Sequence, residues 1–167
     1  IANLNGIAGD NSYDDILYEV LWEFSKVEIW VDNGFRDLGE LANFHKGFSN
    51  WCKKNGYSES LRENLVPVFG TETIADNLSY KKIFSTLDKA ILSIDKKNNV
   101  ILGLVTIEAM LGLLPKRVIL MNLDKVGTDS GPDLNWLKNM TRRDSRVDFF
   151  GAGGLRDHKD YEVVARH

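Results

Sequence analysis

The stretch Ala90–Ile94 (AILSI) is a short apolar run that is followed by an acidic residue, Asp95, and it decides the predicted fold. Other runs of similar length, rich in Val, Ile and Phe, are typical of buried strands. They are Val27–Val31, Leu65–Phe69, Arg117–Met121 and Arg146–Phe150, with Ile1–Leu4 as the tail of an earlier strand. The starts at 27, 65, 90, 117 and 146 are too far apart for hairpins, so we predict βα units in a parallel sheet.

The segments between these runs carry helical patterns. Asp14–Phe24 repeats apolar residues at helical spacing, and its first two residues are acids, which favour a helix start. Lys53–Glu63 predicts a loop or a helical extension, and the turn at Lys97–Asn99 predicts a small hairpin or loop insertion. Further helices are predicted at Leu38–Lys54, Thr106–Leu114, Asp133–Met140 and Asp157–Arg166. Residues 1–167 form one predicted domain, built on either an open doubly wound sheet or a closed barrel.

Composition narrows the class of protein. The net charge of −3 argues against a general binder of nucleic acid or anionic membranes. No apolar run is long enough to span a membrane, and the first residues do not resemble a signal peptide. The single cysteine, Cys52, excludes an intrachain disulfide and fits a reducing, cytoplasmic location. His45, His158 and His167 show no metal-ligand spacing, so no metal site is predicted.

The residues that follow the predicted strands are the candidate functional residues, because ligands of parallel α/β proteins meet the carboxyl ends of strands. Gly70-Thr71 follows one strand, and Gly153 and Gly154 follow another. Glycine lets backbone N–H groups approach an anion closely, so both turns are phosphate-site candidates. The alternative is that these glycines only make tight turns.

Asp95 is the acid–base candidate. A carboxyl at the end of a buried strand is desolvated, and its pKa rises towards a range that is useful for proton transfer. The alternative role is a helix cap or a surface turn residue. Thr128 is a candidate donor of a hydrogen bond to a ligand, with a turn or cap as its alternative.

In this order, the strand-end segments resemble the histidine-biosynthesis isomerase family, which contains the HisA-type isomerase and the related HisF-type cyclase subunit. The matching segments are VDNGFRD (31–37), FGTET (69–73), LSID (92–95), LDKVGTDSGP (123–132) and FGAGGLRD (150–157). They look more like archaeal HisA-like paralogues than the bacterial enzyme, particularly at VGTDSGPD (126–133). The chain departs from the family pattern at Asn33, where a glycine is expected, and at Val126, where an aspartate is expected.

The resemblance implies a (β/α)8 TIM barrel, of which this chain supplies about strands 2 to 7, so that the first and eighth strands would come from elsewhere. It implies aldose–ketose isomerisation of a phosphorylated, phosphoribosyl-type substrate, with Asp95 and Thr128 as catalytic residues and no cofactor. The phosphate-binding residues that it implies are Gly34, Gly70, Thr71, Gly153 and Gly154. An oligomer is compatible with it.

Three hypotheses therefore stand. The first is a HisA-like isomerase that uses aspartate acid–base catalysis. The second is a diverged paralogue in one-carbon or pterin-cofactor metabolism. The third is a protein that binds a phosphorylated metabolite without catalysis, and intact glycine turns without working acid–base groups would favour it.

Overall fold

The computed structural model describes residues 2–3 and 12–165, and its strands form one sheet. The order is β1-β2-β3-β4-β6-β7, every neighbouring pair in it is parallel, and β5 pairs with β4 as an antiparallel hairpin. Apart from that hairpin, spatial order follows chain order, so no reversal of the kind found in doubly wound sheets occurs here. The strands are β1 (Ala2–Asn3), β2 (Ile29–Asp32), β3 (Leu65–Gly70), β4 (Ile91–Lys97), β5 (Val100–Ile101), β6 (Arg117–Asn122) and β7 (Asp148–Ala152).

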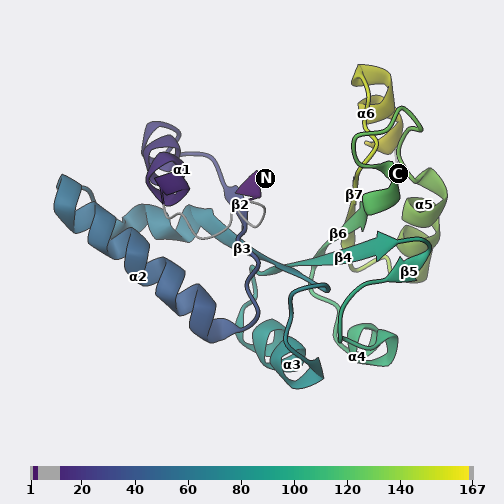
Figure 1. The fold of residues 1–167 in the computed structure, drawn as a ribbon, viewed down its shortest axis with the longest axis horizontal. Coiled ribbons are helices and arrows are strands. Elements are labelled where there is room, and N and C mark those ends of the chain that lie inside the picture. The colour runs from purple at the N-terminus through teal and green to yellow at the C-terminus, as the bar shows by residue number, and fades with distance from the viewer. Residues whose placement is uncertain (1, 4–11, 166–167) are drawn as a thin grey trace.

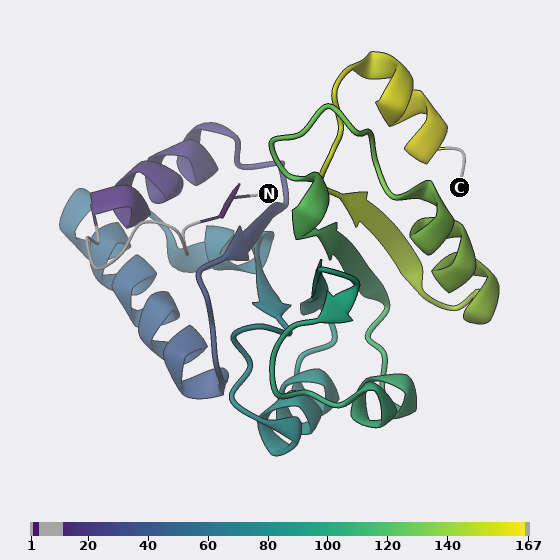
Figure 2. The same ribbon diagram turned by 45° about the vertical axis from the view of Figure 1, so that its right-hand side comes forward.

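The helices lie round the outside of the strands, from α1 and α2 through α3 and α4 to α5 and α6 (Figures 1 and 2). Most of them follow an N-cap residue whose side chain accepts a hydrogen bond from a backbone N–H of the first turn, as at Asp37, Asp76 and Asp133. The helices are α1 (Ser12–Glu23), α2 (Leu38–Asn55), α3 (Asn77–Thr86), α4 (Ile107–Gly112), α5 (Leu134–Arg143) and α6 (His158–Val164), with 3-10 turns η1 (Glu59–Asn64) and η2 (Leu123–Lys125).

The two faces of the sheet carry separate apolar clusters. The larger cluster lies between sheet and helices and includes Phe69, Leu92 and Leu120 from the strands. The smaller cluster is made by the alternate strand residues on the opposite face. Its members are Val66, Val68, Ile91 and Ile119, with Trp30, Met121 and Ala152 packed against them.

The sheet is strongly curved around this second cluster. Trp30 on β2 and Phe150 on β7 pack edge to face with ring centroids 4.9 Å apart, although β3, β4 and β6 lie between their strands. At a strand spacing of about 4.8 Å, a flat sheet would hold β2 and β7 about 19 Å apart. The face that carries Trp30 and Phe150 is therefore concave, and the helices cover the convex face.

An ion pair supports the same curvature at the amino-terminal edge of the sheet. Arg117, the first residue of β6, donates to Glu28 at 2.5 Å and to the Lys89 carbonyl at 2.7 Å. Its guanidinium also lies 5.4 Å from the ring centroid of Trp30. Arg117 thus connects β6 to residues beside β2 across two intervening strands.

The predicted α/β class with a parallel sheet is confirmed, and each predicted strand exists with shifted ends. β1 keeps Ala2 and Asn3 of the predicted run Ile1–Leu4, whose outer residues lie outside the described part. The hairpin predicted at Lys97–Asn99 is present, with Asn98 and Asn99 both at positive φ, as a two-residue type I′ turn requires. Because β5 pairs with Lys96 and Lys97, β4 extends past the predicted end at Ile94.

Two helical segments differ from expectation. Helix α3 is not among the predicted helices, although Tyr80, Ile83 and Phe84 are buried on one face of it. The stretch Lys53–Glu63 is neither a loop nor a lengthened helix throughout. Helix α2 ends at Asn55 because Gly56 adopts a left-handed conformation (φ 72°), and the chain then re-forms the 3-10 turn η1.

A double-mutant cycle tests the curvature. Replacing Trp30 and Phe150 by alanine, singly and together, should give a coupling free energy of about 1 kcal/mol in urea unfolding, because edge-to-face rings attract beyond their buried area. As a control, Trp30 and Phe84 lie on opposite faces of the sheet, and their effects should add to within about 0.5 kcal/mol. A Trp30–Phe150 coupling of zero would mean that β2 and β7 do not meet across the concave face.

Candidate functional site

Parallel strands place their carboxyl ends at one edge of the sheet, and polar residues gather there. Asp32 ends β2 and pairs with Val68, two residues before the end of β3 at Gly70. Asp95 on β4 pairs with Met121 on β6, near the end of that strand. The acid–base candidate and the predicted Gly70-Thr71 turn therefore lie beside each other.

Asp95 is a buried carboxyl on the concave face, with 6% of its surface exposed. Its Oδ1 accepts a hydrogen bond of 2.7 Å from Ser93 Oγ. Its Oδ2 has two longer partners, Thr71 Oγ1 and the Glu72 N–H, both at 3.4 Å. The Asp95 N–H donates to Thr71 Oγ1 at 3.0 Å, which fixes the backbone of β4 to the turn after β3.

A strap of chain after the hairpin lies over the turn that contacts this carboxyl. The Leu102 N–H donates to the Asp95 carbonyl at 2.8 Å. Gly103 then crosses directly over the β3 turn with φ 99°, and a Cβ at this position would lie 1.6 Å from the Thr71 carbonyl oxygen. Only glycine allows that approach, so Gly103 holds the strap down over Thr71 and Asp95.

Gly70 is required by its contact with the carboxyl. A Cβ at this position would lie 2.8 Å from Asp95 Oδ2, closer than real Cβ atoms come. The absence of a side chain at Gly70 therefore provides the space that Oδ2 occupies. This contact is a third role for Gly70, beside the two predicted from the sequence, a phosphate ligand and a simple turn residue.

The pKa of Asp95 is raised to about 6, chiefly by burial and also by the neighbouring carboxylates of Glu72 and Asp32, against the hydrogen bonds from Ser93 and the Glu72 N–H. Burial also raises the pKa of Asp32, with a further contribution from Glu72 and an opposing hydrogen bond from the Gly34 N–H. Two carboxyls at this edge are thus shifted towards neutral pH, where a group can both take and give a proton.

A pocket of about 400 Å³ opens at the ends of β2 and β3, and it is lined by Glu72, whose N–H contacts Asp95 Oδ2. Arg36 gives it a cation and Leu104, on the strap, an apolar wall. Leu104 is 73% exposed, which is unusual for leucine. The lining residues are Gly34, Arg36, Glu72, Thr73, Ile74, Ala75 and Leu104. The predicted phosphate residue Gly34 therefore lies in the same pocket wall as Glu72.

The Thr71 N–H is already used inside the protein, because it donates to the Ser93 carbonyl at 2.8 Å. The Gly34 N–H likewise donates to Asp32 Oδ1 at 3.2 Å. An anion at these two turns would have to use other donors, and Arg36 is the nearest cation in the pocket lining. Phosphate binding by Gly34, Gly70 and Thr71 stays a prediction.

Gly153 and Gly154 lie in a second group, formed by the loops that follow β6 and β7. Both have positive φ, and a Cβ at either would lie 2.5 Å from a backbone oxygen, that of Asn122 or that of Gly131. The loops are therefore packed backbone against backbone. Within the described part of the chain we find no acceptor for the N–H of Gly153 or Gly154, and phosphate binding by these two residues stays a prediction.

Thr128 belongs to this second group. It is exposed, its hydroxyl donates to the Lys125 carbonyl at 3.0 Å, and it also contacts Ser130 Oγ at 2.7 Å. These bonds fit the turn role that was its alternative. The catalytic role of Thr128 stays a prediction, and the structure places this residue with Gly153 and Gly154 rather than with the Thr71–Asp95 contacts.

Sequence reasoning missed Ser93, Asp32 and Arg36. The signal for Ser93 was the two-residue period of a strand, which puts it on the same face as Asp95. Asp32 follows a predicted strand as Asp95 does, and it could have been found by that analogy. Arg36 had no signal of its own, because only the folded turns bring it beside Glu72.

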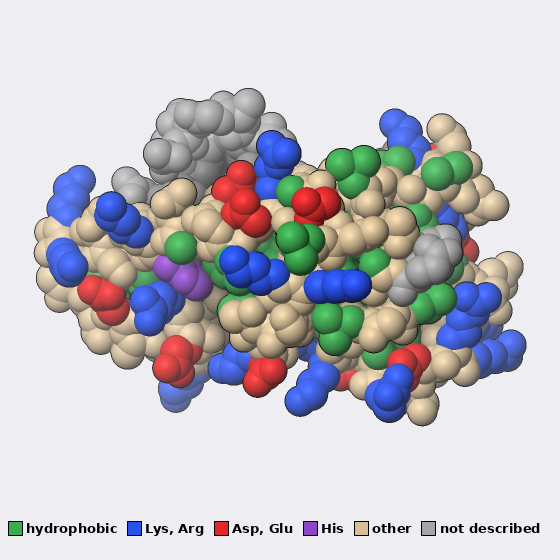
Figure 3. Space-filling model, turned by 90° about the horizontal axis from the view of Figure 1, so that it is seen from below, with side chains coloured by type: hydrophobic (Ala, Val, Ile, Leu, Met, Phe, Trp, Pro, Cys, Tyr) green, Lys and Arg blue, Asp and Glu red, His purple; other side chains and the backbone are tan. Residues whose placement is uncertain are grey.

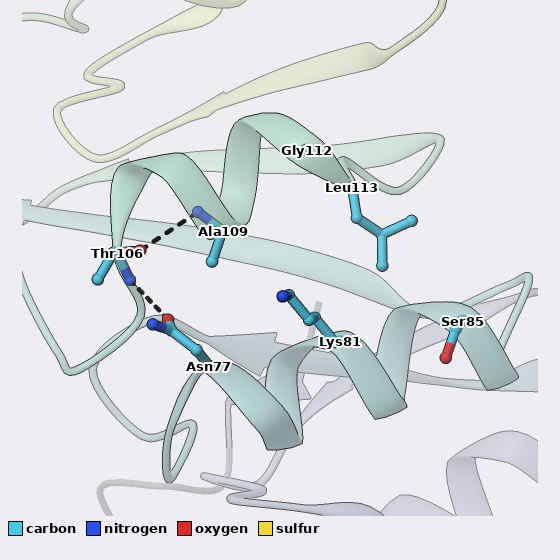
Figure 4. A pocket seen from close by; sticks show the side chains of 7 residues that line it. All are labelled: Asn77, Lys81, Ser85, Thr106, Ala109, Gly112 and Leu113. Atoms are coloured by element: carbon cyan, nitrogen blue, oxygen red, sulfur yellow. Dashed lines mark hydrogen bonds between the residues drawn. The ribbon is translucent and has the colours of Figure 1, made fainter.

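A larger pocket, of about 620 Å³, lies away from this edge, in the groove between α3 and α4 (Figure 4). Lys81 points into the groove, and Asn77 accepts the Thr106 N–H across one end of it. Seen from this side, Lys and Arg side chains lie among hydrophobic ones (Figure 3). Since this groove is on the convex side, we place the candidate site at the strand ends.

Comparison with known proteins adds no assignment: no protein-family model and no curated protein matches the chain. Among the described helices, none combines the length and apolar character needed to cross a membrane. In the same part of the chain, no group of three His, Cys, Asp or Glu side chains is arranged to hold a metal ion.

The raised pKa of Asp95 predicts that Asp95→Asn stabilises the protein at pH 7. The folded protein holds this proton more tightly than the unfolded chain does, so wild-type stability from this group is present near pH 4 and is lost as the pH rises to about 6. A shift of about two units corresponds to about 3 kcal/mol. In urea unfolding, Asp95→Asn should be more stable than wild type by up to that amount at pH 7 and about equally stable near pH 4.

The exposed carboxyl of Asp148 provides the control for this measurement. Asp148→Asn should stay within about 0.5 kcal/mol of wild type at both pH values. An Asp95→Asn variant that is less stable than wild type at pH 7 would show that the charged carboxylate is favourable in the fold, contrary to the prediction.

Proposed function

We propose that this chain is an isomerase-like enzyme that moves protons on a phosphorylated, sugar-derived metabolite, with Asp95 as its acid–base group. One observation carries the proposal: a buried carboxyl on the concave face, at the carboxyl edge of a parallel sheet, in contact with Glu72, which lines an open pocket. A desolvated carboxyl is unfavourable for folding, and such groups gather at sites that use them.

Asp32 is the second acid–base group of the proposal. It lies at the same edge, burial raises its pKa, and its charge acts on Asp95. The Asp95 carboxylate takes a proton from the carbon beside the sugar carbonyl, and the C–H electron pair becomes the double bond of an enediol. Asp32 donates a proton to the carbonyl oxygen. Asp95 then returns its proton to the former carbonyl carbon, while the hydroxyl on the neighbouring carbon gives its proton back to Asp32 and becomes the new carbonyl, which completes an isomerisation without oxidant or reductant.

The two groups of loops suit a substrate with anionic ends. Arg36 in the pocket is a cation that can pair with a phosphate oxygen. The N–H groups of Gly153 and Gly154 are backbone donors of the kind that hold phosphate. The proposed substrate lies between them, across the ends of β4 and β6, which places its reacting carbons beside Asp95.

The proposal extends to the architecture, because a (β/α)8 barrel would put this edge round a common mouth. Sequential parallel strands, helices on the convex face and the Trp30–Phe150 contact support a barrel-like curvature. β1 and β7 have one strand neighbour each among the described residues, so the described strands form an arc.

Turnover tests the function directly. Phosphorylated aldoses and aminoaldoses, beginning with ribose 5-phosphate, are incubated with the protein in D2O, and exchange at C2 is followed by proton NMR. Asp95→Asn should slow exchange on the order of 100-fold or more, because a positioned acid–base group contributes at least that much. Ligand affinity, measured by thermal shift, should change little.

Asp148→Asn is again the matched control and should exchange at the wild-type rate. Full exchange in Asp95→Asn would remove Asp95 from the mechanism. A phosphorylated sugar that raises the melting temperature of wild type without any exchange would favour the non-enzymatic binding protein instead.

A further inference from the structure

The two oxygens of the Asp95 carboxyl have different surroundings, and this difference leads beyond the proposed function. Oδ1 accepts a short hydrogen bond of 2.7 Å from Ser93 Oγ. Oδ2 has only contacts of 3.4 Å, from Thr71 Oγ1 and the Glu72 N–H. A short bond satisfies an anionic oxygen, whereas contacts near the distance limit leave it with unused capacity to accept.

Ser93 is well placed to hold Oδ1 of Asp95. It precedes Asp95 by two residues on β4, so both side chains lie on the concave face. Ser93 is 3% exposed, which shields its hydrogen bond from competition by water. The bond therefore fixes both the rotation of the carboxyl plane and the oxygen that faces the strand.

Oδ2 is the oxygen that faces the turn after β3. Glu72 and Thr73 of that turn line the pocket. A side chain at Gly70 would collide with Oδ2, since its Cβ would lie only 2.8 Å away. Glycine at this position thus leaves room for Oδ2 beside the turn, while Oδ1 is bonded to Ser93.

We infer that Asp95 works asymmetrically: Ser93 holds Oδ1 as a fixed acceptor, and Oδ2, beside Gly70, is the oxygen that takes up and releases the proton. Ser93 is then the positioning residue of the site. The inference rests on the proposed function for its meaning in catalysis, but the asymmetry itself can be tested without any substrate.

The charged groups that face Asp95 and the Ser93 hydroxyl act on the pKa of Asp95 in opposite directions. Glu72, from the turn after β3, and Asp32, from the end of β2, both favour the protonated carboxyl, as burial does. The Ser93 hydroxyl acts in the opposite direction, together with the Glu72 N–H. Removing the hydroxyl should therefore raise the pKa of Asp95 above about 6, and restoring a hydroxyl should bring it back.

The experiment is a carboxyl carbon-13 NMR titration of the whole chain from pH 4 to 9, with the Asp95 signal assigned by its loss in Asp95→Asn. Ser93→Ala should move the midpoint upward by at least about half a unit, which is a threefold change in proton affinity. Ser93→Thr keeps a hydroxyl and should titrate close to wild type. Ser85→Ala, at an exposed serine on α3, is the control and should leave the midpoint unchanged.

A second measurement needs no variant. In wild type above the Asp95 midpoint, the Ser93 hydroxyl proton should give a slowly exchanging, downfield proton signal, and this signal should change as Asp95 is protonated. An unchanged midpoint in folded Ser93→Ala, or a Ser93 hydroxyl that exchanges freely with water, would overturn the inference. Failure of C2 exchange with every sugar would reject the proposed function alone, because neither NMR result depends on turnover.

Discussion

The rest of the structure depends on the curvature of the parallel sheet. The sheet bends until side chains of distant strands touch, as Trp30 and Phe150 do. Bending gives the two faces unequal room. Helices cover the wide convex face, whereas side chains of the concave face converge. A carboxyl on the concave side, such as Asp95, is therefore enclosed by neighbours from several strands without any helix above it.

Much of the fold was predictable because each strand is a compact apolar run, and such runs bury well in a parallel sheet. Strand ends were less predictable. β4 continues past Ile94 because β5 folds back on Lys96 and Lys97, a pairing that no local pattern specifies. α3 has the helical spacing of Tyr80, Ile83 and Phe84, so its omission was a missed pattern rather than a missing signal. The spacing of the runs could not decide between an open sheet and a closed barrel, because the curvature arises from contacts between strands far apart in the chain.

Some residues of the candidate site could likewise be predicted from the sequence, and others could not. Asp95 could be proposed from its place after an apolar run, and the structure gives it the burial and raised pKa that were expected. The role of the neighbouring glycine could not, because Gly70 serves the carboxyl through a contact across β3 and β4. Ser93 and Arg36 reach the site through strand alternation and turn geometry. A sequence gives the type of each residue, but it does not give the atoms that the residue contacts in the fold.

The strap anchored by Gly103 supplies part of the pocket, and it is a different part of the chain from the strands that carry Asp95 and Ser93. The carboxyl and its hydroxyl partner are carried by β3 and β4, whereas Leu104, on the strap, supplies a wall of the adjoining pocket. Under the proposed function, substitutions at Leu104 would alter the shape of the pocket while Asp95 and Ser93 keep their positions. Selectivity and proton transfer would then be free to diversify independently, provided that Gly103 is retained.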